Sequence, residues 1–515
     1  MINLKNRLRQ GLLGLIAKIG KSGNNFFLKK EYVSRTEISY FEDSLVDTQK
    51  IIHQPDVYPL AAFLGRKFGC SHIIDIGCGR ARKLVELHPE FHITGIDYGS
   101  NIKFCRDNYP FGQWIELNLE HGKSVKLKRE VIRHAVVICS DVIEHLKNPI
   151  NLLKLIEDLL RDAPLAVLTT PERDLARGND DTGPPVNPYH MREWNLPEFQ
   201  KLVEAAGLNI RFGGLTVNNN TAFEKKTSLI VCERLEQIKP VNDFRVVAFM
   251  TAFNEEDIIE PSISYLASQG IEVYLIENWS TDTTYERAKN MLGKGLIGIE
   301  RFPAEGPSQY YEWVRLLTRV ETLANEISAD WFIHHDVDEI REGPTPGIRL
   351  KDSIWQVDQS GFNAIDHTVI FFHPVDNNFI PGSDFKKHFS FFEFGRRPGH
   401  FQQIKAWKNL KKRISLAETG GHEVKFEGRR VYPYKFLLRH YPVRSQAHGE
   451  KKVFLERKQR YSPEEKKGRG WHGHYDSING GCSFLKKPED LIWFDDTFYK
   501  TYLVERLTGI GILRQ

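Results

Sequence analysis

Several features that define other protein classes are missing from this 515-residue chain. Its six cysteines include no CxxC pair, which argues against a disulfide framework or a cysteine zinc site and favours reduced thiols in the cytoplasm. No run of about 18 apolar residues occurs, so we expect no segment to span a bilayer. Lys and Arg total 71 against 67 for Asp and Glu, so no global charge points to nucleic acid.

The length is too great for one hydrophobic core, and the composition, with 41% hydrophobic and 27% charged residues, is typical of soluble globular protein. Segments of apolar residues at strand and helix spacing recur in two blocks. We therefore predict an α/β protein of two domains, residues 36–236 and 244–515, joined by a linker at 237–243.

The first 35 residues form a separate segment. No acidic residue precedes Glu31, whereas lysines and arginines recur, and leucines and isoleucines fall at helical spacing. Two interpretations stay open: peripheral attachment to an anionic membrane at its inner face, or a helix packed on the folded body. A signal peptide fits less well, because Lys18 interrupts the apolar region.

Short apolar runs alternate with helical stretches from His72 onward, which predicts a parallel sheet covered by helices. A glycine turn, Asp75-Ile76-Gly77-Cys78-Gly79, follows the first strand, and Asp97 ends the second. Such a turn lets a ligand approach the backbone, and an acid at that position can accept both hydroxyls of a ribose. Of the two cofactors that suit this pattern, a dinucleotide is disfavoured because Arg82 replaces the third glycine of GxGxxG, so we favour S-adenosylmethionine.

The stretch IIDIGCGRARKLVEL resembles motif I of class I S-adenosylmethionine-dependent methyltransferases, and GIDYG, SDVIEHLKNP and LTTPERD resemble their later strand ends. The resemblance implies a Rossmann-like fold. It also implies cofactor contacts from Asp75, Gly77, Gly79, Asp97, Asn118 and Asp141, with Asn118 standing where many relatives carry Asp. The loop and helix from Pro184 to Ala206 resemble methyltransferases of bacterial surface-polysaccharide clusters.

Methyl transfer needs a deprotonated or polarised nucleophile. Asp141, Glu144 and His145 are spaced to share one face of a helical turn, and His190 lies in a loop that could cover them and contact substrate. His145 could be a general base or only a helix-start residue. Alternatively, the four side chains could hold a divalent ion, an arrangement implied by resemblance to small-RNA 2′-O-methyltransferases and, for the first three, to ubiquinone-pathway O-methyltransferases.

The second domain contains Trp331-Phe332-Ile333, which predicts the end of a buried strand, followed by Asp336 and Asp338. Two carboxylates at this spacing can bind one Mg²⁺ or Mn²⁺ and leave positions open for phosphate oxygens. A solvated acidic turn is the alternative.

Three stretches, AFNEEDII, LIENWSTDTT and WFIHHDVDEI, resemble in this order the family 2 glycosyltransferases of the GT-A fold. The resemblance implies a nucleotide-sugar donor, UDP- or GDP-linked, with Mn²⁺ or Mg²⁺. It places Ala252, Asn254 and Glu255 near the nucleotide and Glu277 at the base or ribose. Asp336 would neighbour the sugar, and Asp338 would hold the metal.

Farther along the chain the usual acidic pair that supplies a catalytic base is not recognisable. Glu423 is a candidate base and His422 a candidate metal ligand, although most charged residues here fit a solvated surface equally well. The basic run from Lys451 to Arg460 is typical of a solvated helix face.

These patterns predict a cytoplasmic fusion of two enzymes of surface-glycan biosynthesis. One would transfer a sugar and the other a methyl group to a glycan or lipid-linked acceptor. In the alternative, one domain is a non-catalytic binding module that positions the other.

Overall fold

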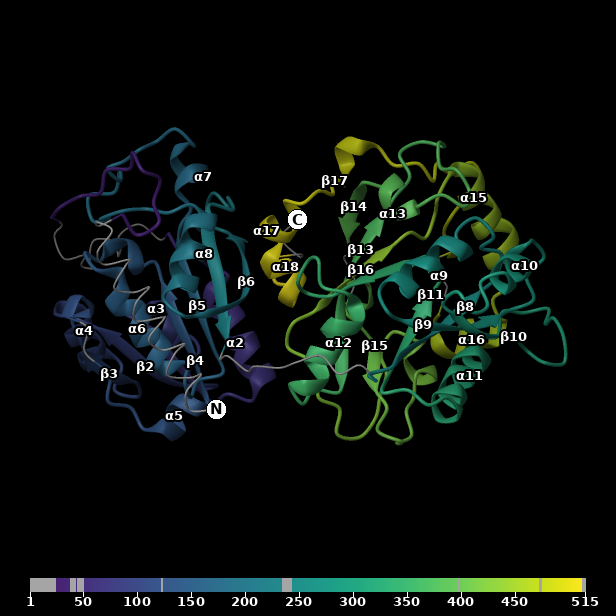
Figure 1. Cartoon of the computed structure of the whole chain (residues 1–515), viewed down its shortest axis with the longest axis horizontal. Helices are drawn as coiled ribbons and strands as arrows, with labels where there is room; N and C mark the ends of the chain where they lie inside the picture. The colour runs from purple at the N-terminus through teal and green to yellow at the C-terminus, as the bar shows by residue number, and fades with distance from the viewer. Residues whose placement is uncertain are drawn as a thin grey trace. The chain divides into compact units, whose positions relative to one another are not determined.

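The computed structural model describes residues 25–37, 43, 51–121, 124–233, 243–395, 398–471 and 475–511. The chain divides into two compact units, Met1–Gln237 with Thr497–Gly511, and Ile238–Asp496 with Ile512–Gln515 (Figure 1). Both units are mixed α/β structures, as predicted. Most of the basic N-terminal segment, residues 1–24, lies outside the described residues. Among the described helices, none combines the length and the apolar character needed to cross a membrane.

The first unit is built on a seven-stranded sheet in the order β3-β2-β1-β4-β5-β7-β6. Strands β1 to β5 are parallel, and β7 runs antiparallel to both β5 and β6. The strands are β1 (His72–Ile76), β2 (His92–Asp97), β3 (Gln113–Glu116), β4 (Ala135–Ser140), β5 (Leu165–Pro171), β6 (Asn209–Thr216) and β7 (Thr227–Glu233). The central strands are buried on both faces, which explains why their sequences are mainly apolar.

Helices cover this sheet, and two of them begin at recognisable capping residues. Asn195 and Glu198 form a capping box at the start of α8, and Asn148 caps α6 through the Ile150 amide. The helices are α2 (Val57–Phe68), α3 (Arg82–Val85), α4 (Ser100–Asn108), α5 (Arg129–Arg133), α6 (Pro149–Leu159), α7 (Arg173–Arg177) and α8 (Leu196–Ala205).

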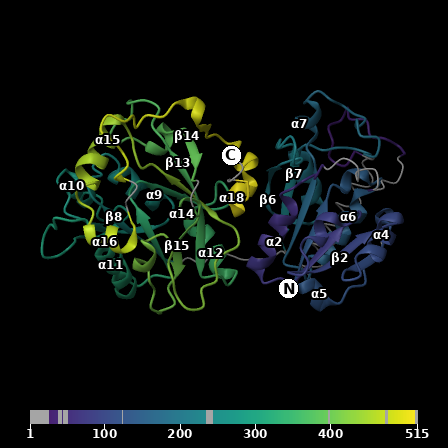
Figure 2. The same cartoon turned by 180° about the vertical axis from the view of Figure 1, so that it is seen from behind.

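Residues Thr497–Gly511 belong to the first unit, contrary to the expectation that residues 244–515 form one domain. Helices α17 (Phe498–Thr501) and α18 (Leu503–Thr508) lie beside edge strand β6, as Figures 1 and 2 show in yellow. Gly214 permits the approach, since a Cβ there would lie 2.6 Å from the Lys500 carbonyl oxygen. The Lys225 ammonium also pairs with Glu505 at 2.6 Å. A covered edge cannot pair with another chain.

The second unit contains a ten-stranded sheet whose main path is β10-β9-β8-β11-β15-β13-β14-β17, with β12 paired to β16 and β16 to β13. Strands β8 to β11 are parallel, and β15 runs antiparallel to β11. The strands are β8 (Val246–Ala252), β9 (Glu272–Glu277), β10 (Leu296–Arg301), β11 (Trp331–Asp336), β12 (Glu339–Glu342), β13 (Ala364–Phe372), β14 (Phe391–Phe394), β15 (Gln403–Lys408), β16 (Phe436–His440) and β17 (Ile492–Trp493).

Helix α11 (Trp313–Glu326) turns its apolar face to this sheet, where Phe249, Phe332 and Trp407 form part of the same core. A π-helix over Lys451–Arg457 directly follows α15, and such turns are frequent at functional sites. The other helices are α9 (Ile259–Ser268), α10 (Thr284–Lys289), α12 (Leu350–Gln359), α13 (Phe385–His388), α14 (Pro398–Phe401), α15 (Gln446–Glu450) and α16 (Pro463–Arg469).

Candidate functional site

A cavity of about 1340 Å³ lies at the carboxyl ends of the parallel strands in the first unit. This edge is where open α/β sheets bind ligands. The predicted residues that line the cavity are Gly77, Gly79, Asp97, Asn118, Asp141, Glu144, His145 and His190. The sheet therefore brings together residues that are spread over more than a hundred positions of sequence.

The glycine turn after β1 forms one wall of the cavity. Gly77 and Gly79 have φ angles of 76° and 55°, and a Cβ at Gly77 would come within 2.3 Å of Val142. Asp97 accepts hydrogen bonds from the Gly79 amide at 2.7 Å and from the Tyr98 amide at 2.6 Å. Asp97 therefore connects the end of β2 to the glycine turn at the cavity wall.

Asp75 does not line the cavity, in contrast to the predicted cofactor contact. Its side chain is fully buried in β1, where Oδ2 accepts a hydrogen bond of 2.7 Å from the Tyr58 hydroxyl. Burial raises the pKa of Asp75 to about 7, although the Tyr58 hydrogen bond acts in the opposite direction. The Asp75 side chain therefore connects β1 to Tyr58 of α2.

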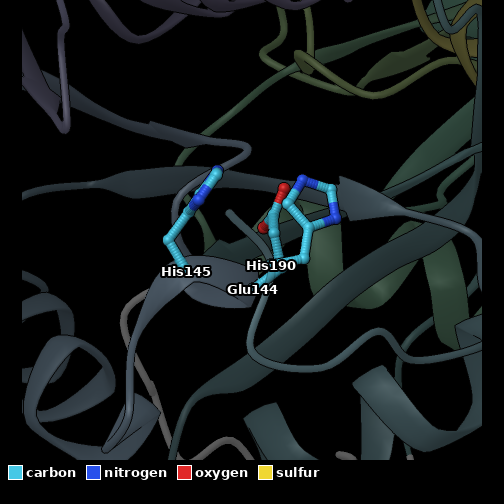
Figure 3. A group of neighbouring side chains, drawn as sticks. All are labelled: Glu144, His145 and His190. Atoms are coloured by element: carbon cyan, nitrogen blue, oxygen red, sulfur yellow. The ribbon is translucent and has the colours of Figure 1, made fainter. Parts of the chain in front are cut away.

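Glu144, His145 and His190 form a compact group at the cavity wall (Figure 3). One ligand atom from each lies within 4.8 Å of the others. Glu144 is fully buried, and its Oε2 accepts a hydrogen bond of 2.9 Å from Thr170. Its Oε1 has no hydrogen-bond partner among the described residues, and burial raises the pKa of Glu144 well above its ordinary value. A buried carboxylate oxygen in this state is favourable only beside a cation or a proton.

The two histidines are oriented by hydrogen bonds to their Nδ1 atoms. His145 Nδ1 donates to the Tyr189 carbonyl oxygen at 2.8 Å, and His190 Nδ1 lies 2.6 Å from Glu193 Oε1. Each contact places the lone pair on Nε2, the usual arrangement of metal-binding histidines. In His190 this lone pair is engaged, because the Asn187 side-chain amide nitrogen lies 2.9 Å from Nε2. Burial lowers the pKa of His145 to about 4, which keeps its imidazole neutral. The three side chains are of the types that hold a divalent cation, and a cation bound to His190 Nε2 would take the place of the Asn187 amide.

Asp141, the fourth predicted ligand, does not belong to this group. Its φ of 53° ends the strand in the left-handed conformation, and only a short 3₁₀ turn, Ile143–His145, follows. The predicted helical face therefore does not form, and Asp141 Oδ1 instead accepts a hydrogen bond of 3.1 Å from Thr169. Sequence reasoning missed Lys83, a cavity-lining residue whose Nζ donates to the His53 carbonyl oxygen at 3.0 Å.

The second unit also gathers its predicted residues at the carboxyl ends of parallel strands. Ala252 ends β8, and Asn254 follows with a φ of 52°. The Asn254 side chain accepts from the Thr281 amide at 2.8 Å and donates to Glu456 at 2.7 Å. Glu277, at the end of β9, accepts from the Ser280 amide at 2.5 Å. These bonds fix the loops after β8 and β9 against each other.

Two buried lysines contact the acidic residues after β11. Lys405 Nζ lies 2.8 Å from Asp336 Oδ2, and Lys452 Nζ lies 3.0 Å from Asp338 Oδ2. Neighbouring cations hold the pKa of both aspartates below the usual range, against the effect of burial. Because Lys452 is only 6% exposed, the expectation that Lys451–Arg460 forms a solvated face is wrong at this residue.

The remaining predicted residues of the second unit do not complete a metal site. Glu423 pairs with the Arg429 guanidinium, so its carboxylate is engaged as an ion pair. Burial lowers the pKa of His422 to about 4. Among the described residues of this unit, no three His, Cys, Asp or Glu side chains bring ligand atoms together. A divalent ion at Asp336 or Asp338 would therefore have to be held by one or two carboxylates and by phosphate oxygens, beside the ammonium groups of Lys405 and Lys452.

Comparisons with known proteins concern the first unit. A sequence profile described as a methyltransferase domain matches residues 56–211. A probable S-adenosylmethionine-dependent methyltransferase of Mycolicibacterium smegmatis is 28% identical over 152 residues, 29% of this chain and 51% of the relative. The chain thus spans about half the length of that relative. The first unit carries a class I S-adenosylmethionine-dependent methyltransferase domain, as its motifs predicted.

Two solved structures were also found to be similar. One is an S-adenosylmethionine-dependent methyltransferase from Aquifex aeolicus, with 13% identity, a TM-score of 0.28 and coverage of 38% of this chain and 100% of that chain. The other is the methyltransferase domain of bacterial CtHen1-CN, with 21% identity, a TM-score of 0.26 and coverage of 35% and 98%, respectively.

Proposed function

We propose that the first unit transfers a methyl group from S-adenosylmethionine to a hydroxyl of a glycan. The observation that carries the proposal is the buried Glu144 carboxylate, which faces two oriented histidines on the wall of the cavity. The cofactor supplies an electrophilic methyl group. Glu144, His145 and His190 would hold a divalent cation, which lowers the pKa of a nearby hydroxyl.

The chain's own residues would position both reactants. Gly77 and Gly79 leave the backbone accessible at the cavity wall, and Asp97 accepts hydrogen bonds at the end of β2. Glu193 fixes the His190 ring, and Arg177 in turn binds Glu193 at 2.7 Å. A cavity of about 1340 Å³ exceeds the common range of about 300–1,000 Å³ for small-molecule pockets, which leaves room for a second reactant.

The test uses the full chain with isotope-labelled S-adenosylmethionine and a panel of glycans. Asp97→Ala should weaken cofactor binding, measured by calorimetry. Glu144→Gln and His190→Ala should retain cofactor binding but lose methyl transfer by about 100-fold or more, because they remove ligands and not the cofactor pocket. Glu157→Gln, on the outer part of α6, is the matched control. Equal methylation by all variants would contradict the assignment.

For the second unit we propose transfer of a sugar from a UDP- or GDP-linked donor to a glycan or lipid-linked acceptor. Its support is the parallel order β10-β9-β8-β11, with Asn254, Glu277 and Asp336 at three neighbouring strand ends. Such an edge is the usual ligand-binding position of an open α/β sheet. Together the two units would make a bifunctional enzyme of surface-glycan synthesis.

A panel of nucleotide sugars tests this proposal through release of the nucleoside diphosphate. Asp338→Asn should abolish release of the diphosphate and leave S-adenosylmethionine affinity unchanged. Asp352→Asn, in the first turn of α12, should behave as the unmodified chain. If no donor is hydrolysed under any condition, the second unit is better explained as a binding module.

A further inference from the structure

Two buried lysines occupy the positions where a divalent cation would neutralise the acidic residues of the second unit. Lys405, on β15, is 2% exposed, and its Nζ lies 2.8 Å from Asp336 Oδ2 and 2.9 Å from Glu339 Oε1. Both distances are those of charge-assisted hydrogen bonds. The ammonium therefore bridges two carboxylates, as a metal ion would.

Lys452 makes a similar bridge from the π-helix. Its Nζ lies 3.0 Å from Asp338 Oδ2 and 3.3 Å from Glu255 Oε1. Asp338 Oδ1 lies 3.5 Å from His440 Nε2, so both oxygens of this carboxylate have a nitrogen neighbour. Glu255 also pairs with Arg444. A divalent cation at Asp338 would have to displace Lys452 or be repelled by its charge.

We propose that Lys452 and Lys405 take the place of the divalent cation, so that the second unit binds a nucleoside diphosphate without metal. The inference rests on the proposed sugar transfer. An ammonium has three N–H donors. Lys452 directs two of them at Asp338 and Glu255, which leaves the third for a phosphate oxygen.

In the reaction, the bond between the anomeric carbon and the β-phosphate oxygen breaks, and its electron pair stays on that oxygen. The acceptor hydroxyl oxygen forms the new bond to the anomeric carbon, and its proton passes to water. Lys452 stabilises the charge that develops on the departing diphosphate. Lys405 neutralises Asp336, which would otherwise repel the phosphates.

Mn²⁺ titration followed by electron paramagnetic resonance tests the lysine assignment. The full chain carries His190→Ala, which removes a ligand of the first unit's group. This chain should bind no Mn²⁺ at Asp338, so adding Asp338→Asn should not change the number of Mn²⁺ ions bound per chain. Lys452→Met should gain one bound Mn²⁺ per chain, which Asp338→Asn then removes, whereas Lys452→Arg should gain none.

Mn²⁺ that is bound in the presence of Lys452 and lost on Asp338→Asn would overturn the proposal. If Lys452→Met fails to fold, comparing the His190→Ala chain with and without Asp338→Asn still shows whether Asp338 binds Mn²⁺. Binding of UDP and GDP supplies the second measurement. Equal affinity in EDTA and in Mn²⁺ supports the inference, and a requirement for Mn²⁺ overturns it. Binding under neither condition contradicts the donor class proposed above, while the Mn²⁺ titration decides the lysine assignment by itself.

Discussion

Asp75→Asn should stabilise the first unit strongly at alkaline pH and weakly at acidic pH. Below its ordinary pKa of 3.8, Asp75 is protonated in both the folded and the unfolded chain, so its ionisation does not lower the free energy of unfolding. As pH rises from 3.8 towards about 7, only the unfolded chain loses the proton, so stability falls. One pKa unit corresponds to about 1.4 kcal/mol, which gives a cost of about 4 kcal/mol at pH 8 and about 1.5 kcal/mol at pH 5.

The amide of Asn can accept the Tyr58 hydrogen bond at every pH, so the variant should lose this pH dependence. Urea unfolding, followed by hydrogen exchange of peptides from β1 and β4, measures the first unit separately from the second. The gain from Asp75→Asn should be larger at pH 8 than at pH 5 by about 2.5 kcal/mol. Asp107→Asn, on exposed α4, is the matched control. An equal change at both pH values would refute the reasoning, because a packing effect does not depend on pH.

Three further outcomes follow from the contacts. Leu503→Asp should destabilise the first unit by about 3 kcal/mol or more, because it places a charge at a fully buried position over β6. Amide hydrogen exchange should become faster in β6 but not in the second unit. Arg444→Met should lower the free energy of unfolding of the second unit by about 3–5 kcal/mol, because Glu255 and Asp257 lose their buried guanidinium partner. In the same urea titration, the control Lys466→Met on α16 should lower it by less than about 1 kcal/mol. EDTA should abolish methyl transfer in a radiolabel assay without changing the affinity for S-adenosylmethionine; full methylation in EDTA would contradict the metal role of the first unit.

The sequence predicted most of the central strands, because β1, β4 and β8 are buried on both faces and consist mainly of apolar residues, with Asp75 as a buried exception in β1. Strand β3 was missed since it is only four residues long and half-buried, which leaves a weak pattern. The glycine turn and Asp97 could be predicted because an acid about 20 residues after a glycine-rich turn is a sequence pattern of nucleotide-binding sites.

Contacts between distant segments could not be predicted in the same way. Lys452 reaches Asp338 across 114 positions, and Lys405 reaches Asp336 across 69. No periodicity connects such pairs, so the basic run near Lys452 was taken for a solvated face. The prediction that Asp141 shares a helical face with Glu144 and His145 was wrong for a different reason. Their spacing fits a helix, but Asp141 itself has a left-handed backbone conformation, which changes where its side chain lies.

The return of residues 497–511 to the first unit has a consequence for how the chain folds. The methyltransferase sheet is complete in sequence at Glu233, yet helices α17 and α18, which lie beside its edge strand β6, follow the whole second unit. During synthesis β6 would therefore remain uncovered while about 260 further residues are made, and an uncovered edge is prone to pairing with other chains. A fragment that ends near residue 240 has the same defect permanently. Loss of activity in such a fragment could result from the exposed edge of β6 alone and would not show that the two units cooperate. A fair comparison therefore keeps residues 497–511 attached to the first unit through a flexible linker.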